Sequence, residues 1–225
     1  TFEGDREYEA KIIGTDPQEN YVIVEGTATI LPGNPVGAME THLYRIDLAS
    51  RRTQRLTQEP GTHHGQLSSD GQVLIDSWSS VTVPGRIDLR DVRTGTVTKT
   101  LLTSRDPLAG HVVGTIETLT IIGENGDRLN ARLIKPSYFS EKQRYPVLIY
   151  VYNGPHVQLV TNSFLGGASH WMLEAAERGY LVFTVDGHGS DNRGRDFEQA
   201  IHRRLGEVEV KDQLRGVEYL KGLPY

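Results

Sequence analysis

The first half of the chain alternates short apolar segments with polar turns. Up to about residue 110, turns that contain Asp, Asn or Gly lead into β-branched runs such as residues 21–24 and 72–75. Asp and Asn side chains stabilise such turns by hydrogen bonding to the backbone, and β-branched residues favour strands. The pattern therefore predicts an all-β region over residues 1–110.

Within this region two stretches resemble each other. Asp47 and Asp91 hold equivalent positions in the runs 43–48 and 87–92, and they lie 44 residues apart. Repeats of about 40 to 50 residues that contain only strands are typical of β-propeller blades. We therefore expect propeller blades, although two unrelated hairpins of a β-sandwich would also fit this spacing.

After residue 110 the pattern changes. Strand-like runs at 117–122 and 129–134 flank an Asn125-Gly126 turn. Asn-Gly between two such runs is a strong hairpin signal, because both residues adopt positive φ at little cost. A β-hairpin is thus expected to open the second half of the chain.

Two continuous apolar runs follow, at residues 146–152 and 180–185. Runs without alternation are typical of strands that are buried on both faces of a parallel sheet. The segment 168–178 between them has a helical composition, and Gly179 stands where a glycine commonly ends a helix. Strand, helix and strand in this order predict a βαβ unit.

The last helix is expected at residues 208–221. Its apolar residues recur at spacings of four, three and three, which places them on one stripe of a helix, and a Gly-Leu-Pro sequence at 222–224 ends it. Residues 111–225 therefore read as the beginning of an α/β domain. The residues of the stripe are Val210, Leu214, Val217 and Leu220.

Composition narrows the function classes. The chain has 225 residues, a net charge of −5 and no cysteine. Without cysteine there are no disulfides, thiolate metal sites or cysteine nucleophile, and the negative charge argues against a nucleic-acid partner. No apolar run approaches the roughly 20 residues that span a membrane.

One candidate catalytic residue is Tyr152, at the end of the first buried run. In α/β domains, catalytic groups collect where the strands reach their carboxyl ends. A phenol held there, just before Asn-Gly-Pro, could donate a hydrogen bond to a developing oxyanion. From the residues alone, a tyrosine with a purely structural role at the strand end is the simpler interpretation.

A second motif, Asp-Gly-His-Gly-Ser at residues 186–190, places three triad residue types within five positions. Triad members must converge from separate elements, so this compactness favours a structural glycine-rich turn. No serine in the sequence stands in a Gly-x-Ser-x-Gly nucleophile elbow.

No metal or cofactor is expected. His63 and His64 are adjacent, so in a strand they point to opposite faces and cannot share a metal ion. Gly187 and Gly189 lack the third glycine of a dinucleotide-binding motif.

From Tyr145 onward the chain resembles the prolyl oligopeptidase superfamily, specifically its dipeptidyl peptidase IV branch. Tyr145 and the segment 146–155 look like the strand that enters the family's oxyanion region. Residues 186–190 look like its Asp-Gly-Arg-Gly-Ser loop, with His188 in place of the usual arginine. The segment 200–206, together with Asp212-Gln213, is similar to a further signature. The form is similar to bacterial dipeptidyl and prolyl tripeptidyl aminopeptidases.

The resemblance covers residues 117–225 well and residues 1–110 more loosely. It implies the last blades of a β-propeller over residues 1–110, followed by the N-terminal portion of an α/β-hydrolase domain over residues 111–225. It also implies that Tyr152 stabilises the oxyanion. The family's catalytic serine lies in a Gly-Trp-Ser-Tyr-Gly-Gly elbow after a helix that matches 208–221, and its aspartate and histidine follow later. We therefore expect the chain to end before its nucleophile and to be inactive alone.

The function implied for the complete protein is that of a serine exopeptidase. Its substrates would be peptides with proline near the N-terminus, and the resemblance leaves dipeptidyl and tripeptidyl release open. It implies a homodimer and favours a periplasmic or cell-surface location, with a cytoplasmic one still open. A non-catalytic propeller and hydrolase-like binding protein is the alternative. An esterase is a third option, which the propeller disfavours because it would admit only slender substrates.

Overall fold

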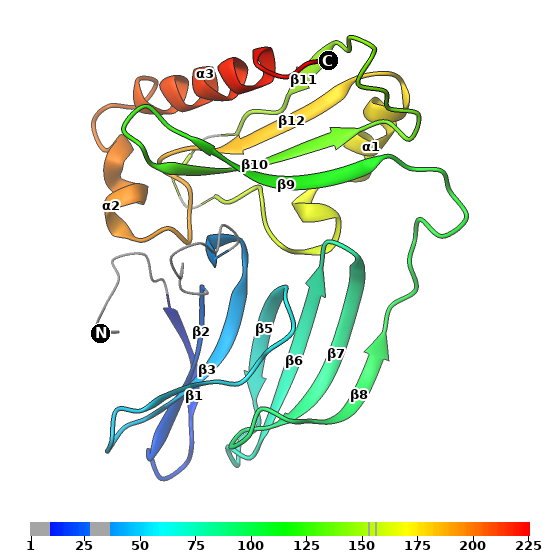
Figure 1. Cartoon of the computed structure of the whole chain (residues 1–225). Helices are drawn as coiled ribbons and strands as arrows, with labels where there is room; N and C mark the ends of the chain where they lie inside the picture. The colour runs from blue at the N-terminus through cyan, green and yellow to red at the C-terminus, as the bar shows by residue number, and fades with distance from the viewer. Residues whose placement is uncertain (1–9, 28–36, 153, 156) are drawn as a thin grey trace. The chain divides into compact units, whose positions relative to one another are not determined.

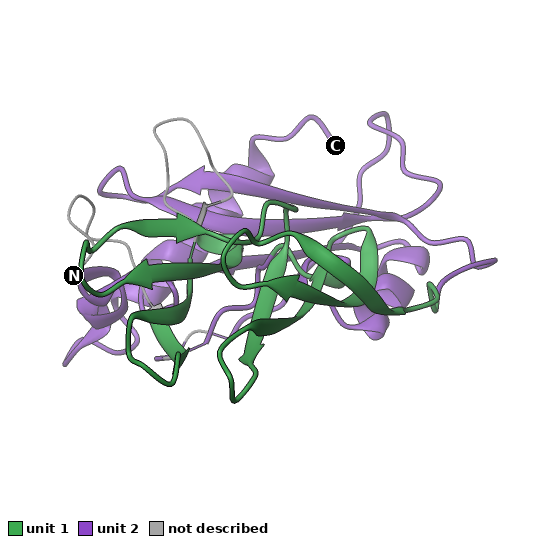
Figure 2. Cartoon of the chain, turned by 90° about the horizontal axis from the view of Figure 1, so that it is seen from below, with its two compact units in different colours: residues 1–107, 162–164 green, residues 108–161, 165–225 purple. Residues whose placement is uncertain are grey.

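The computed structural model describes residues 10–27, 37–152, 154–155 and 157–225 (Figure 1). The chain divides into two compact units (Figure 2). The first comprises residues 1–107 and 162–164, and the second comprises residues 108–161 and 165–225.

The first unit is built from two consecutive groups of antiparallel strands. In each group the strands pair with their neighbours in the sequence, and the groups meet through one parallel pairing of Thr41 with Thr62. The first group is β1 (Ala10–Thr15), β2 (Tyr21–Thr27), β3 (Thr41–Asp47) and β4 (Thr53–Arg55), with a 3-10 turn η1 (Gly37–Met39) before β3; the second is β5 (Thr62–Leu67), β6 (Val73–Ser80), β7 (Val83–Asp91) and β8 (Val97–Thr103).

The two aspartates that reveal the repeat in the sequence occupy the same place in the two groups. Asp47 ends β3 and Asp91 ends β7. Each carboxylate accepts a backbone N–H three residues on, from Ser50 at 2.7 Å and from Thr94 at 2.9 Å. The similarity between the two stretches is therefore a similarity of structure, a third strand followed by an aspartate-stabilised turn.

On β5, His63 and His64 point to opposite faces, as their adjacency in the sequence predicts. His63 is fully buried and its Nδ1 lies 3.0 Å from the carboxylate of Asp76. The His64 side chain is largely exposed and its Nδ1 lies 2.9 Å from Oε1 of Glu25. Buried apolar side chains of both groups also form one core, which consists of Ile23, Leu43, Leu56, Leu74 and Val92.

The second unit has a four-stranded sheet in the order β11-β12-β10-β9. The strands are β9 (Thr115–Ile122), β10 (Arg128–Lys135), β11 (Val147–Ile149) and β12 (Leu181–Asp186). The predicted hairpin is confirmed: β9 and β10 pair antiparallel, and Gly126 in their turn has φ 87°. The predicted βαβ unit is confirmed as well, because β11 and β12 pair in parallel and a helix connects them.

Helices cover this sheet on both faces. Odd-numbered residues of the strands, among them Leu133 and Phe183, form an apolar core against which Tyr219 and Leu220 of helix α3 (Val208–Lys221) pack. Side chains alternate along a strand, so even-numbered residues such as Arg132 point to the other face, where Arg132 contacts Met172 of helix α1 (His170–Glu177). The helical elements are η2 (Phe164–Gly167), α1 (His170–Glu177), α2 (Arg195–Glu198), η3 (Gln199–Ile201) and α3 (Val208–Lys221).

Of the two strands that the sequence predicts to be buried, one is confirmed and one needs correction. All six residues of β12 are buried, as predicted. In β11, however, Val147 is 40% exposed, because β11 lies at the end of the strand order. The apolar run at 146–152 therefore does not form a strand that is buried along its whole length.

Helix α3 has the predicted bounds, but only part of the predicted stripe packs: Leu220 lies against the core. Val210 and Leu214 of the apolar stripe are 50% and 55% exposed, whereas Asp212 and Gly216 are buried. Gly216 lets the helix backbone approach the sheet closely, and Asp212 is buried because His188 hydrogen-bonds to it. Close approach and polar contacts outweigh the apolar periodicity here.

Across the described residues, no helix combines the length and the apolar character needed to cross a bilayer.

Candidate active site

Tyr152 lies just beyond the carboxyl end of β11. The N–H of Tyr150 donates to the carbonyl of Phe183 at 2.8 Å and continues the pairing with β12 by one residue. The Tyr152 side chain is 54% exposed, and among the described residues none hydrogen-bonds to its hydroxyl. Within the described part of the chain, the phenol therefore has no competing acceptor and can donate to a ligand. Asn153, the next residue of the motif, lies outside the described part of the chain.

The far end of this segment is held by Asp186, the last residue of β12. Its carboxylate accepts the N–H of Leu159 at 3.0 Å and that of Val160 at 2.8 Å. Burial of the carboxyl raises the pKa of Asp186 to about 6, although these two N–H groups and the charges of Arg132 and Arg193 act in the opposite direction. Asp186 thus fixes the backbone of the segment that follows β11 through these two hydrogen bonds.

Arg132 of β10 holds the same segment through its carbonyls. Its guanidinium donates to the carbonyl of Leu159 at 2.8 Å and to that of Gly166 at 2.6 Å, and it also donates to Thr184 Oγ1 at 3.2 Å. Burial lowers the pKa of Arg132 to about 10, so the side chain stays protonated near neutral pH. Leu159 is consequently bound at both its N–H and its C=O.

The Asp-Gly-His-Gly-Ser segment at 186–190 forms a tight turn. Gly189 has φ 95°, and Ser190 Oγ donates to the carbonyl of Gly187 at 2.7 Å. Asp186, His188 and Ser190 each have different partners and do not form a triad. The contacts agree with the structural turn expected from the sequence.

His188 connects this turn to two other elements. Its Nδ1 lies 2.8 Å from Oδ2 of Asp212 on α3, and its Nε2 lies 3.2 Å from Oδ2 of Asp127 in the β9–β10 turn. The ring stacks on Phe197 with 4.4 Å between centroids. The hydrogen bond to Asp212 and the two negative charges raise the pKa of His188.

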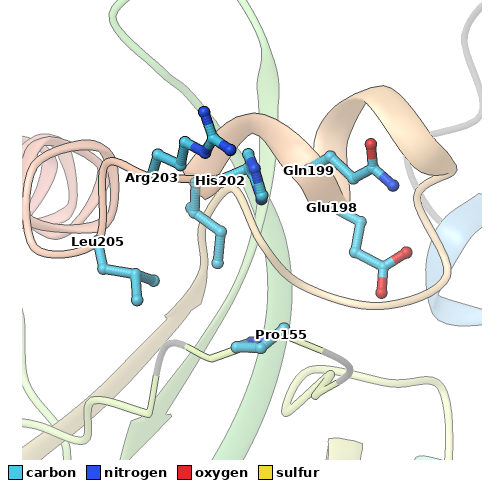
Figure 3. A pocket seen from close by; sticks show the side chains of 7 residues that line it. Pro155, Glu198, Gln199, His202, Arg203 and Leu205 are labelled. Atoms are coloured by element: carbon cyan, nitrogen blue, oxygen red, sulfur yellow. The ribbon is translucent and has the colours of Figure 1, made fainter.

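A pocket of about 290 Å³ lies beside the Tyr152 segment (Figure 3). Pro155 stands on one side of it, and the α2–η3 segment and the residues after it stand on the other. Since consecutive Cα atoms are 3.8 Å apart, the Cα atoms of Pro155 and Tyr152 are within about 11 Å of each other. The lining combines apolar and polar groups, which suits part of a peptide. It consists of Pro155, Glu198, Gln199, Ile201, His202, Arg203 and Leu205.

The sequence predicts Tyr152 as a candidate but does not reveal the residues that hold its segment. The position of Arg132 within the mostly apolar run 129–134 is the one signal in the sequence for its role. An arginine that is buried in such a strand is rare unless it is paired, so a buried partner could have been expected. Asp186 was noted only as part of a turn. Its role depends on Leu159 and Val160, which are distant in the sequence and have no side-chain pattern that marks their N–H groups as bound.

Comparison with known proteins relates both units to one family. Residues 3–85 match the dipeptidyl peptidase IV (DPP IV) N-terminal region, and residues 167–225 match the prolyl oligopeptidase family.

Curated relatives agree. The chain is 29% identical to dipeptidyl peptidase 8 of Mus musculus over 218 residues, which cover 92% of this chain and 23% of the relative. It is 29% identical to a probable dipeptidyl peptidase 4 of Neosartorya fischeri over 192 residues, which cover 83% of this chain and 25% of the relative. The chain thus spans about a quarter of the length of these relatives.

Solved structures match over nearly the whole chain. A protein from Bacteroides ovatus, assigned as a dipeptidyl aminopeptidase IV, superposes with a TM-score of 0.89 at 35% identity, covering 99% of this chain and 31% of the other. Dipeptidyl peptidase 4 of Porphyromonas gingivalis superposes with a TM-score of 0.84 at 25% identity, covering 99% and 30%. The chain belongs to the prolyl oligopeptidase family, and within it to the dipeptidyl peptidase IV type.

Proposed function

We propose that this chain is part of a serine exopeptidase that removes short peptides from the N-termini of its substrates after proline. The family and the names of the relatives support a dipeptidyl peptidase activity. The preference for proline follows from the resemblance of residues 145–155 and 186–190 to the dipeptidyl peptidase IV branch. The substrates are peptides with a free N-terminus and proline near it.

We assign residues 1–110 to the last blades of a β-propeller and residues 111–225 to the N-terminal portion of an α/β-hydrolase domain. Two consecutive four-stranded antiparallel groups support the first assignment. The second is supported by a sheet in which a hairpin precedes parallel strands that a helix connects. In this arrangement Tyr152 lies where catalytic groups collect, at the carboxyl end of a parallel strand.

The exposed hydroxyl of Tyr152, which has no hydrogen-bond partner among the described residues, carries the mechanistic part of the proposal. When a serine attacks the carbonyl that follows proline, the carbonyl oxygen becomes an oxyanion. The Tyr152 hydroxyl donates a hydrogen bond to that oxygen and stabilises the tetrahedral intermediate more than the substrate. One such donor contributes about 10²–10³-fold to kcat.

The nucleophile and its base belong, in this proposal, to the rest of the protein. No serine of the printed sequence stands in Gly-x-Ser-x-Gly, and an oxyanion donor without a nucleophile and a base performs no acyl transfer. We also infer from the resemblance that the complete protein is a homodimer, which analytical ultracentrifugation tests directly.

The experiment is Tyr152→Phe in the full-length protein, assayed with Gly-Pro-p-nitroanilide. We expect kcat to fall about 100-fold or more, with little change in KM or in Tm, because the donor acts mainly in the transition state. Tyr180→Phe is the matched control, since Tyr180 is also largely exposed. An unchanged kcat for Tyr152→Phe would remove Tyr152 from the mechanism.

Substrate scope is tested with the unmodified full-length protein. Release of p-nitroaniline from Gly-Pro but not from Gly-Gly derivatives would support cleavage after proline, and a tripeptidyl substrate distinguishes the two release lengths. If no peptide with a free N-terminus is cleaved, the non-catalytic binding protein becomes the better account.

A further inference from the structure

The segment that carries Tyr152 is attached at both ends to the same strand. Near its beginning, the Tyr150 N–H is bound by the carbonyl of Phe183, and at its end the Leu159 N–H is bound by Asp186. Phe183 and Asp186 are three residues apart on β12, which corresponds to about 10 Å. The described ends of the 150–159 loop, residues 150–152 and 157–159, are therefore both attached to β12, and Tyr152 lies two residues from the first attachment.

The second attachment is made by buried charges rather than by apolar packing. Asp186 is 3% exposed and Arg132 is 1% exposed. They lie on the same face of the sheet, because Asn130 pairs with Asp186 and Arg132 with Thr184. Burying such groups is costly unless their hydrogen bonds are satisfied. Here the two charges bind the N–H and the C=O of one residue, Leu159, which fixes the position and the orientation of its backbone.

The turn after Asp186 holds the same end of the loop, at the two residues before Leu159. The N–H of Asp191 donates to the carbonyl of Val157 at 3.4 Å, and Asn192 Nδ2 donates to Oε1 of Gln158 at 2.9 Å. Asp186 is the first residue of this turn, and its carboxylate binds the end of the loop. It therefore connects the turn to the loop.

We propose that Asp186, supported by Arg132, is a positioning residue for Tyr152: it holds the end of the 150–159 loop and thereby keeps the phenol where the oxyanion forms. The proposal rests on the function proposed above. An oxyanion donor is effective only when its position is fixed before the reaction, because a donor that must reorganise loses part of its stabilising effect.

The ionised form of Asp186 is the one that holds the loop. A carboxylate accepts hydrogen bonds at both oxygens, whereas a protonated carboxyl has one oxygen that donates. The charged groups that face it are Arg132 from β10 and Arg193 from the turn after β12, and both favour the ionised form. Burial nevertheless raises its pKa to about 6, so we expect the loop to be released as the pH falls through this value.

The first test is Asp186→Asn in the full-length protein, with Asp196→Asn, at an exposed aspartate of α2, as the matched control. We expect kcat for Gly-Pro-p-nitroanilide to fall about tenfold with KM changed less than twofold, and the control to stay near wild type. In a Tyr152→Phe background, Asp186→Asn should cause no further loss of kcat, because the donor that it positions is already gone. An equal loss in both backgrounds would overturn the proposal.

The second test uses pH. The ratio of kcat for wild type to kcat for Asp186→Asn should be largest above pH 7 and approach one near pH 5, since the protonated wild type then resembles the amide. The ratio cancels any titration that the two proteins share, including that of a catalytic histidine. A ratio that does not depend on pH would overturn the role assigned to the charge.

The third test does not use activity and separates the two proposals. Hydrogen exchange at the Leu159 and Val160 amides should be at least tenfold faster in Asp186→Asn than in wild type or in Asp196→Asn. If Asp186→Asn folds poorly, Arg132→Lys takes its place in this experiment. Lysine keeps the charge but lacks the planar set of donors, so exchange at these amides should again be faster. Unchanged exchange in both variants overturns the attachment itself. If exchange is faster but Tyr152→Phe keeps its kcat, the attachment stands and the function assigned to Tyr152 fails.

Discussion

Gly216 of α3 faces the ring of Phe183 on β12 so closely that a Cβ at residue 216 would lie 2.9 Å from Cε1 of the ring. The same ring stacks on Tyr219, one turn further along the helix, with 6.2 Å between centroids. The glycine therefore sets the distance between helix and sheet in the second unit.

Gly216→Ala tests this close approach. Alanine should favour the helix by about 1 kcal/mol, but forcing a methyl group into packed side chains costs about 1–3 kcal/mol. We expect the steric cost to win and the urea midpoint to fall.

Phe183→Leu supplies the control for that prediction. A smaller side chain at 183 leaves room for the methyl group, so Gly216→Ala should cost less in this background than in wild type. Equal costs in the two backgrounds, or a stabilised single variant, would contradict the steric explanation.

The ion pairs of His188 should make stability depend on pH. Its pKa is raised by Asp212 and Asp127, so its contribution is complete below the unfolded value of about 6.5 and is lost as the pH rises through the higher folded value. We expect the urea midpoint to fall between pH 6 and pH 8.5 for this reason.

His188→Arg provides the comparison, because arginine keeps its charge throughout this range. The fall in the midpoint between pH 6 and pH 8.5 should shrink in this variant. His170→Arg, at an exposed histidine in α1, should leave the fall unchanged. The explanation fails if His188→Arg and wild type show the same dependence.

A buried polar cluster stabilises the first unit. The carboxylate of Asp76 is fully buried and binds Nδ1 of His63 at 3.0 Å and Nε of Arg90 at 2.8 Å. Asp76→Ala should cost about 3 kcal/mol, because it removes the buried carboxylate that Arg90 and His63 share, while Arg90 keeps its ion pair with Glu59 at 2.8 Å. Urea unfolding measures this, with Asp70→Ala at an exposed turn as a control that should cost about 1 kcal/mol or less.

The polypeptide of residues 1–225 should not hydrolyse Gly-Pro-p-nitroanilide. Tyr152 can stabilise an oxyanion only after a nucleophile has formed one. Turnover by a homogeneous sample of this polypeptide, with contaminating peptidases excluded by an inhibitor profile, would show that the nucleophile lies among these residues.

Local patterns predicted the elements of the second unit well. Asn125-Gly126 predicted the hairpin, and the run at 180–185 predicted β12 as a buried strand. The packing of α3 was not predictable from periodicity, because its buried face contains Asp212 and Gly216, a hydrogen-bonding residue and a residue without a side chain. Apolar spacing detects neither kind of contact.

The candidate site likewise has some features that local sequence predicts and others that it does not. The position of Tyr152 at a strand end follows from the sequence, since a strand and its end are local features. The attachment of its loop does not, because Asp186 and Arg132 bind backbone groups of Leu159, and any residue type except proline presents the same groups. Only the three-dimensional structure brings these partners together.

The two strand groups of the first unit are held internally by backbone ladders, but within the described residues they meet through one parallel pairing and a shared apolar core. Cohesion between the groups is therefore carried mainly by side chains. A gene duplication that adds such a group therefore needs side chains that fit those of the neighbouring group on the facing surfaces. It does not need a new register of backbone hydrogen bonds between strands. The number of groups can then change during evolution while each keeps its internal geometry.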